Sequence, residues 1–184
     1  GGGSGAVTLS AVTLLVNYVY LDSEERKKFA QNSHEYLIEQ VQYQSEAAGA
    51  NSNIRLNFNH PCKQLIWTES TGTAAANFAS YGSNITHGLL KLNGHDRFDR
   101  ETAKYFTDVQ VLEHHTRRPD SSVHVYSFAL NPEEHQPSGT CNFSRIDNAH
   151  LKQSGTQHTV STIYAVNYNV LRIMSGMGGL AYSN

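Results

Sequence analysis

The chain has 184 residues, within the usual range of one domain and long enough to bury a substantial core without disulfides or metals. Its 14 Lys and Arg against 16 Asp and Glu give a formal net charge of -2, so it lacks the positive field that drives nucleic-acid binding. The longest apolar runs, 11–16 and 123–130, are far too short to span a bilayer, which argues against membrane insertion.

The N-terminal end is predicted to hold a linker and then a strand. The first five residues, GGGSG, have the composition of a flexible linker rather than of a signal peptide, and we leave them out of the fold prediction. Residues 6–184 are expected to form a single domain. Its first segment, 7–20, is rich in Val, Thr, Leu and Tyr and predicts a long strand.

A short helix is predicted over residues 23–31. Asp22 can cap the first amides and Glu25, three residues later, can return the hydrogen bond, as in a capping box. Phe29 is expected to dock this helix on the domain.

The next segments have the pattern of strands. Residues 36–43 fit the two-residue period of a strand better than the period of an amphipathic helix. Two short strands are predicted at 54–59 and 63–68, with a break at Pro61 between them. Residues 69–86 are small and polar and predict a long surface loop.

The second half of the chain is also predicted to be β. Asn93-Gly94 is a strong turn dipeptide. Four further strands are predicted, at 105–115, 123–130, 139–144 and 159–174. The last would extend about 50 Å at roughly 3.3 Å per residue, so we expect it to bend, bulge or change partner. About eight to ten strands with one helix indicate an all-β fold, an antiparallel sandwich or barrel.

Ten histidines raise the question of a metal site. His114 and His115 are adjacent and, on a strand, would project to opposite faces, which is poor geometry for one metal ion. His124 and Tyr126 share a face of the next strand, and His135 lies in the loop that follows. The spacing therefore favours scattered imidazoles over a metal centre.

No catalytic motif is complete. SHEYLIEQ begins like a zinc-protease helix, but Ile38 occupies the place of the second histidine. The adjacent Glu133 and Glu134 have the pattern of a solvated pair rather than of a catalytic dyad. Neither Cys62 nor Cys141 lies in a nucleophile context. The sequence predicts neither an enzyme nor a cofactor.

Two kinds of side chain are candidates for covalent modification. Cys62 and Cys141 permit one disulfide, but two free, mostly buried thiols are the favoured interpretation. Asn84, in the sequon NIT, lies in the predicted loop and can carry a glycan in a secreted chain, whereas Asn142, in NFS, lies in a predicted strand.

Five long stretches carry a family resemblance: LDSEERKKFAQNSHEYLIEQ (21–40), LNFNHPCKQLIW (56–67), LLKLNGHDRF (89–98), VYSFALNPEEHQPSGTCNFSRIDN (125–148) and YAVNYNVLRIMSGMGGLAYSN (164–184). Together, and in this order, they resemble the C-terminal half of the major capsid protein of nucleocytoplasmic large DNA viruses. The likeness is greatest to phycodnavirus (chlorella-virus) and mimivirus-like members.

The resemblance implies a jelly-roll β-sandwich, the second of the two jelly rolls that the family carries in tandem. It also implies a structural role in the virion, without enzymatic activity. In the family, three chains form a trimer and trimers tile an icosahedral shell with minor capsid proteins, assembled in the host cytoplasm. The stretch 131–148 then becomes a shaped connection between strands, with Glu133, Glu134 and Arg145 as candidate salt-bridge or interface residues.

Two other functions remain open for a jelly roll, because fold alone does not determine function. One is a glycan-binding or host-attachment module. The other is a cupin-type enzyme, which would need three or four converging His or Glu ligands. In any of these roles Trp67 is expected to lie in the core of the sandwich.

Overall fold

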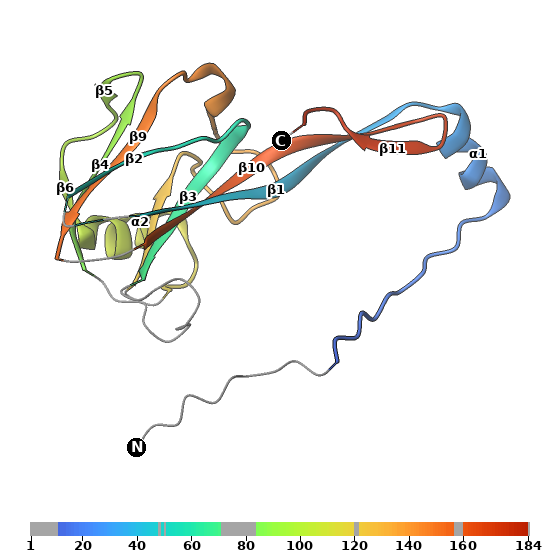
Figure 1. The fold of residues 1–184 in the computed structure, drawn as a ribbon. Helices are drawn as coiled ribbons and strands as arrows, with labels where there is room; N and C mark the ends of the chain where they lie inside the picture. The colour runs from blue at the N-terminus through green and yellow to red at the C-terminus, as the bar shows by residue number, and fades with distance from the viewer. Residues whose placement is uncertain are drawn as a thin grey trace.

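The computed structural model describes residues 11–47, 49, 51–70, 84–119, 122–156 and 160–183. Two antiparallel sheets pack against each other as a β-sandwich (Figure 1). The first sheet has the order β1 (His34–Ala47), β10 (Val160–Met174), β3 (Pro61–Ser70), β7 (Val123–Ser127), with β8 (Cys141–Asn142) against β3 and β11 (Met177–Leu180) against β10. The second has the order β2 (Asn51–Arg55), β9 (Ala149–Gly155), β4 (Ile85–Leu92), β5 (His95–Asp96), with β6 (Glu101–Thr102) against β4.

The strand order is that of a jelly roll. From β1 to β4 the chain alternates between the two sheets, and late strands return to lie beside early ones: β10 between β1 and β3, and β9 between β2 and β4. These long-range antiparallel neighbours form the two facing sheets of a jelly roll, so the predicted all-β jelly-roll sandwich is confirmed.

The long strand β10 organises the first sheet. It pairs with β1 along their whole length and with β3 and β11 on its other edge, and its register to β3 shifts between Val166 and Asn167. The predicted bulge and change of partner are therefore confirmed. Beyond the sandwich, β1 and β10 continue as a projecting ribbon that carries β11 and the helix α1 (Ser23–Gln31) at its tip (Figure 1).

Local sequence chemistry explains the elements that were predicted best. The Asp22 carboxylate accepts a hydrogen bond from the Glu25 amide at 2.9 Å, which confirms the capped helix. Phe29 is half-buried and its ring lies 4.8 Å from that of His34. Asn93 and Gly94 have positive φ values of 51° and 83°, as a tight hairpin turn between β4 and β5 requires.

The predicted strand 105–115 is wrong. This segment forms a π-helical turn, η1 (Tyr105–Val109), followed by α2 (Gln110–His114). Phe106, Gln110 and Val111 are buried on one side of these turns, and Phe106 packs on Trp67 with ring centroids 5.1 Å apart. Burial at positions i, i+4 and i+5 suits a helix, and this tertiary contact outweighs the strand propensity of the segment.

The predicted strand 7–20 is also wrong over its described part. Residues 11–20 belong to no strand and are exposed, because strand-forming residues need a partner strand to complete their hydrogen bonds. Residues 7–10 lie outside the described part of the chain.

Several boundaries differ from prediction. The strand predicted at 54–59 ends at Arg55, and that at 123–130 ends at Ser127. Of the segment 139–144, only Cys141–Asn142 is a strand, since the 3-10 turn η2 (Phe143–Arg145) follows. The predicted loop 69–86 begins and ends inside β3 and β4, and its central residues 71–83 lie outside the described ranges.

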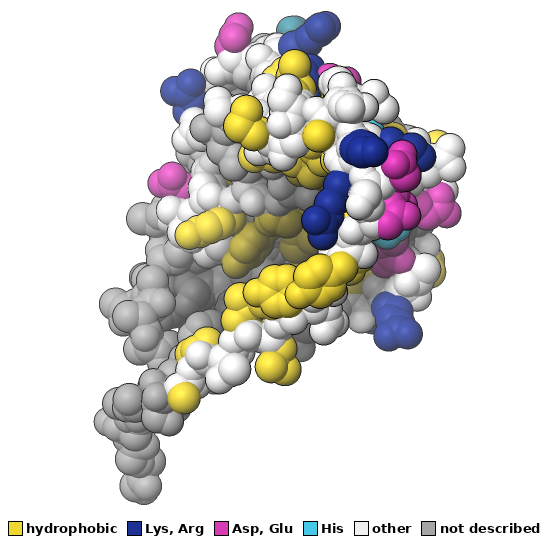
Figure 2. All heavy atoms as spheres, turned by 90° about the vertical axis from the view of Figure 1, so that its right-hand side faces the viewer, with side chains coloured by type: hydrophobic (Ala, Val, Ile, Leu, Met, Phe, Trp, Pro, Cys, Tyr) yellow, Lys and Arg dark blue, Asp and Glu magenta, His cyan; other side chains and the backbone are white. Residues whose placement is uncertain are grey.

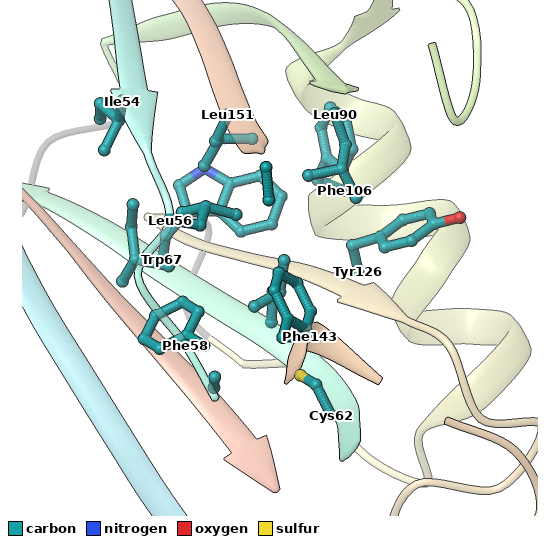
Figure 3. Packing of buried hydrophobic residues seen from close by; sticks show 14 of the residues in the cluster. Ile54, Leu56, Phe58, Cys62, Trp67, Leu90, Phe106, Tyr126, Phe143 and Leu151 are labelled. Atoms are coloured by element: carbon teal, nitrogen blue, oxygen red, sulfur yellow. The ribbon is translucent and has the colours of Figure 1, made fainter. Parts of the chain in front are cut away.

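The core lies between the two sheets, around Trp67. Its side chain is 1% exposed and points between the sheets, as Figure 3 shows. Buried neighbours come from both sheets and from η1: Ile54, Leu65, Leu90, Phe106, Tyr126, Leu151 and Ile163. The expected core position of Trp67 is confirmed.

Candidate assembly surface

The histidines that raised the metal hypothesis lie in unlike environments. His114 and His115 lie at the end of α2 rather than on a strand, and their Nδ1 atoms lie 2.9 Å from the Leu130 carbonyl and 3.2 Å from Glu133 Oε1. His124 is buried beside Trp67, whereas His135 is fully exposed, 3.8 Å from Glu39. Among the described residues, no three His, Cys, Asp or Glu side chains converge on a possible metal site.

A buried lysine anchors the loop 131–140 on the first sheet. Lys63 on β3 is 1% exposed, and its ammonium donates to Glu39 Oε1 at 2.7 Å and to the Glu134 carbonyl at 3.2 Å. The same ammonium lies 5.3 Å from the centre of the Tyr168 ring. These contacts hold the loop against the sheet, so it forms a defined part of the surface.

The other predicted loop residues have separate environments. The Glu133 carboxylate accepts hydrogen bonds from Thr116, and these, with the nearby His115, lower its pKa. Glu134 contributes its backbone carbonyl to Lys63, while its side chain is exposed. Arg145 lies in η2 and lines an open groove of about 560 Å³.

The two sequon asparagines lie at strand ends. Asn84 is half-buried just before β4, and its Oδ1 accepts from the Thr156 hydroxyl at 3.4 Å. Asn142 ends β8, where its Oδ1 accepts from both the amide and the hydroxyl of Ser144. The Asn142 oxygen thus caps the turn η2, and the Asn84 oxygen links the start of β4 to the residue after β9.

The first sheet has an exposed apolar face, which we call the outer face. The side-chain oxygens of Gln42 and Gln44 on β1 accept hydrogen bonds from backbone amides of the segment after β2. Because side chains alternate along a strand, those at the odd-numbered positions of β1 point the opposite way. On that side Val41 and Tyr43 are 59% and 71% exposed. The outer face comprises Leu37, Val41 and Tyr43 of β1 with their register partners Val170, Val166 and Tyr164 of β10.

The outer face is not among the features predicted from the sequence, although residues 36–43 carry a signal for it. Residues 36–43 carry apolar side chains on both sides of the strand, with Tyr36 and Ile38 on one side and Leu37, Val41 and Tyr43 on the other. A strand of an isolated sandwich needs only one apolar side. An apolar second side indicates a second contact.

Further exposed apolar side chains lie at the ribbon tip and in the N-terminal segment. At the tip, Met174, Met177, Leu180 and Tyr182 are between 49% and 74% exposed. In the segment 11–20 the large apolar side chains are between 53% and 91% exposed: Val12, Leu14, Leu15, Val16, Tyr18, Val19 and Tyr20. Figure 2, which views the molecule from the side of the tip, shows hydrophobic side chains gathered in patches on this surface. Exposed apolar patches of this kind are typical of surfaces that bind another protein, a membrane or a ligand.

Two ionisable side chains are buried near Trp67. Burial raises the pKa of Glu69 on β3 from 4.5 to about 7, although hydrogen bonds from backbone amides of Asn84 and Ile85 oppose the shift. Burial lowers the pKa of His124 on β7 from 6.5 to about 4. The sandwich therefore favours the neutral form of both groups.

These shifts predict opposite pH dependences that partly cancel. In the folded protein Glu69 stays protonated up to about pH 7, whereas its ordinary pKa in the unfolded chain is 4.5. The stability that the protonated side chain contributes is therefore lost as the pH rises from 4.5 to about 7. Folded His124 resists protonation, so its contribution is lost as the pH falls from 6.5 toward 4. Between pH 5 and 7, the stability of Glu69→Gln should rise relative to the wild type by about 2 to 3 kcal/mol.

Urea unfolding at pH 5, 6 and 7 measures this difference. His124→Phe is the matched variant, and its stability should fall relative to the wild type between pH 5 and 6.5. Parallel stability curves for the wild type and both variants would show that neither group titrates with a shifted pKa.

Comparison with known proteins identifies the family. Residues 25–179 match the family model described as large eukaryotic DNA virus major capsid protein. The whole chain is 50% identical to the major capsid protein of Pyramimonas orientalis virus, of which it covers 51%. It is 39% identical, over 99% of its length, to the major capsid protein of Paramecium bursaria Chlorella virus 1, of which it covers 57%.

A solved structure gives the same result. A chain of the PBCV-1 virus capsid superposes with a TM-score of 0.77 at 37% identity, over 91% of this chain and 56% of that one. The chain thus spans about half the length of the curated relatives it matches. On the strength of the family match and of these identities, the chain belongs to the family of large eukaryotic DNA virus major capsid proteins.

Proposed function

We propose that the chain is part of a structural subunit of an icosahedral virus capsid, and that it has neither an enzymatic activity nor a cofactor. The outer face is the observation that carries this proposal. Obligate interfaces are richer in apolar and aromatic side chains than free surface, and Val41, Tyr43 and Tyr164 give the outer face that composition. The β-sandwich behind the outer face would form the rigid body of the subunit.

The proposed partners are further copies of the capsid protein, first in a trimer and then in the capsid lattice, together with minor capsid proteins. The subunit would act in the virion after assembly in the host cytoplasm. Direct contact with nucleic acid is not part of the proposal, because the net charge is only -2. No described helix is both long and apolar enough to cross a membrane.

The segment 11–20 supports assembly independently. Val12, Leu14, Val16, Tyr18 and Tyr20 occupy alternate positions and would form one apolar side of a strand. In the described fold this segment has no partner strand. We therefore restrict the jelly-roll domain proposed for residues 6–184 to the part after residue 20, and assign 11–20 as a strand added to a sheet outside this sandwich.

We propose that the polar candidate residues Glu133, Glu134 and Arg145 act at the edges of contacts between subunits. Among the described ion pairs, none uses the side chain of Glu134 or Arg145, so both are available to a neighbouring subunit. Glu133 already contacts His115 and is the weaker candidate. Asn84 remains the candidate for a glycan.

Mass measurement of the complete capsid protein tests the outer face. The wild type should form trimers, and a Val41→Asp/Tyr43→Asp variant should remain monomeric at the same concentration, because two carboxylates would have to lose their hydration at the interface. Leu112→Asp is the matched control: Leu112 is 85% exposed but lies on α2, outside the outer face.

If the Val41→Asp/Tyr43→Asp variant forms trimers that are as stable as those of the wild type, the outer face takes no part in assembly. A monodisperse wild-type monomer that binds a sugar saturably on a glycan array would contradict the capsid proposal and favour an attachment module.

A further inference from the structure

Cys62 and Cys141 are brought together by the fold. They are direct partners in the antiparallel pairing of β3 with β8. Side chains of direct cross-strand partners point to the same side of a sheet, and their Cα atoms lie about 4.5 to 5.5 Å apart. This spacing falls within the range that disulfides bridge, about 4.4 to 6.8 Å.

Both cysteines are free thiols, and they differ in access. Cys62 is fully buried in the core, as Figure 3 shows, and its Sγ donates to the Gln64 carbonyl at 3.2 Å. Cys141 is only partly buried and packs against the same core cluster. A dissolved reagent therefore reaches Cys141 first, while Cys62 lies beside it out of contact with solvent.

The thiols are also protected from fast reaction. Burial raises the pKa of Cys62, and the neighbouring Cys141 adds to that shift. Burial raises the pKa of Cys141 as well, although Arg97 opposes the shift. Since the thiolate is the reactive form, both cysteines react slowly at neutral pH and stay reduced in the cytosol.

We propose that Cys62 and Cys141 form a cross-strand disulfide when the protein passes from a reducing compartment to an oxidising one. The Cys141 thiolate attacks a small-molecule disulfide and expels one thiolate, giving a mixed disulfide. Cys62 then loses its proton and attacks the Cys141 sulfur, and the second small thiol leaves. Two protein S–H bonds are replaced by one S–S bond, and the small disulfide is reduced to two thiols.

The disulfide would tie β8 to β3 covalently. The chain between the two cysteines contains β4, η1, α2, β7 and the loop 131–140, so one bond closes a long loop that includes much of the sandwich. Cross-links across long loops remove the most entropy from the unfolded chain. The benefit to a particle outside the cell rests on the proposed capsid function, whereas formation of the bond does not.

The test is oxidation of the purified, folded protein with oxidised glutathione. Intact mass should fall by two hydrogen atoms, both thiols should disappear together, and digestion should yield a linked peptide pair that dithiothreitol separates. The melting temperature should rise by several degrees and return to its first value after reduction.

Cys141→Ala and Cys62→Ala are the controls. Each leaves one thiol and should show no rise in melting temperature with oxidant, and Cys141→Ala should leave Cys62 unmodified while the protein stays folded. The proposal is overturned if Cys141 of the wild type stops at the mixed disulfide with Cys62 still reduced. It is equally overturned if the linked peptide appears only after denaturation. Neither outcome depends on whether the protein assembles.

Discussion

Replacing Trp67 with alanine is expected to lower the free energy of unfolding by about 3 to 5 kcal/mol, the range for large aromatic side chains in protein cores. Trp67 is 1% exposed, lies edge-on to Phe106 with ring centroids 5.1 Å apart, and stacks on His124 at 5.7 Å. Its removal would leave a cavity between the two sheets. Urea unfolding monitored by circular dichroism measures the loss, since the variant lacks the only tryptophan.

Trp67→Phe separates packing from polarity. The Nε1 atom of the Trp67 indole is buried and has no hydrogen-bond partner among the described residues. Replacing the indole with a phenyl ring therefore breaks no hydrogen bond to those residues. This variant should therefore lose clearly less stability than Trp67→Ala. A loss below about 1 kcal/mol for Trp67→Ala would contradict the core position of the ring.

The second large effect is expected at the Lys63–Glu39 pair, and it should be asymmetric. Lys63 has 2% of its side chain exposed and Glu39 34%. Glu39→Ala leaves a buried ammonium without its carboxylate and should cost about 2 to 4 kcal/mol, somewhat below the range for a fully buried pair because water can enter from the side of Glu39. Lys63→Met leaves a carboxylate that water can reach, so it should cost less than about 2 kcal/mol.

Urea unfolding of both single variants and of the double variant gives the comparison. The double variant should be more stable than Glu39→Ala, because it no longer contains the unpaired ammonium. If Lys63→Met is the more damaging of the two single changes, the ammonium stabilises the fold mainly through the Glu134 carbonyl and the Tyr168 ring rather than through Glu39, because methionine keeps most of the apolar stem of lysine.

The elements that the sequence predicted best are those whose causes are local. The capped helix depends on Asp22 and the turn between β4 and β5 on Asn93-Gly94, residues that act within a few positions of themselves. The bulge of β10 was expected from the length of its strand pattern, since strands of that length are uncommon without a bend, a bulge or a change of partner.

The elements that were missed depend on distant residues. Segment 105–115 is helical because Phe106 fills the space beside Trp67, a contact that no pattern within the segment reveals. Residues 11–20 have a strand pattern but no partner among the described strands. The pairing of Cys62 with Cys141 and the burial of Lys63 depend on the register of β3 with β8 and on the folded loop 131–140, which sequence periodicity does not specify.

A three-dimensional reconstruction of the virion tests the central claim most directly. The account predicts that the jelly-roll sandwich lies in the capsid shell, that density of a neighbouring domain covers Tyr43 and Tyr164, and that residues 11–20 form a strand in an adjoining sheet. A shell in which Tyr43 and Tyr164 face solvent in every copy, or from which the domain is missing, would contradict it.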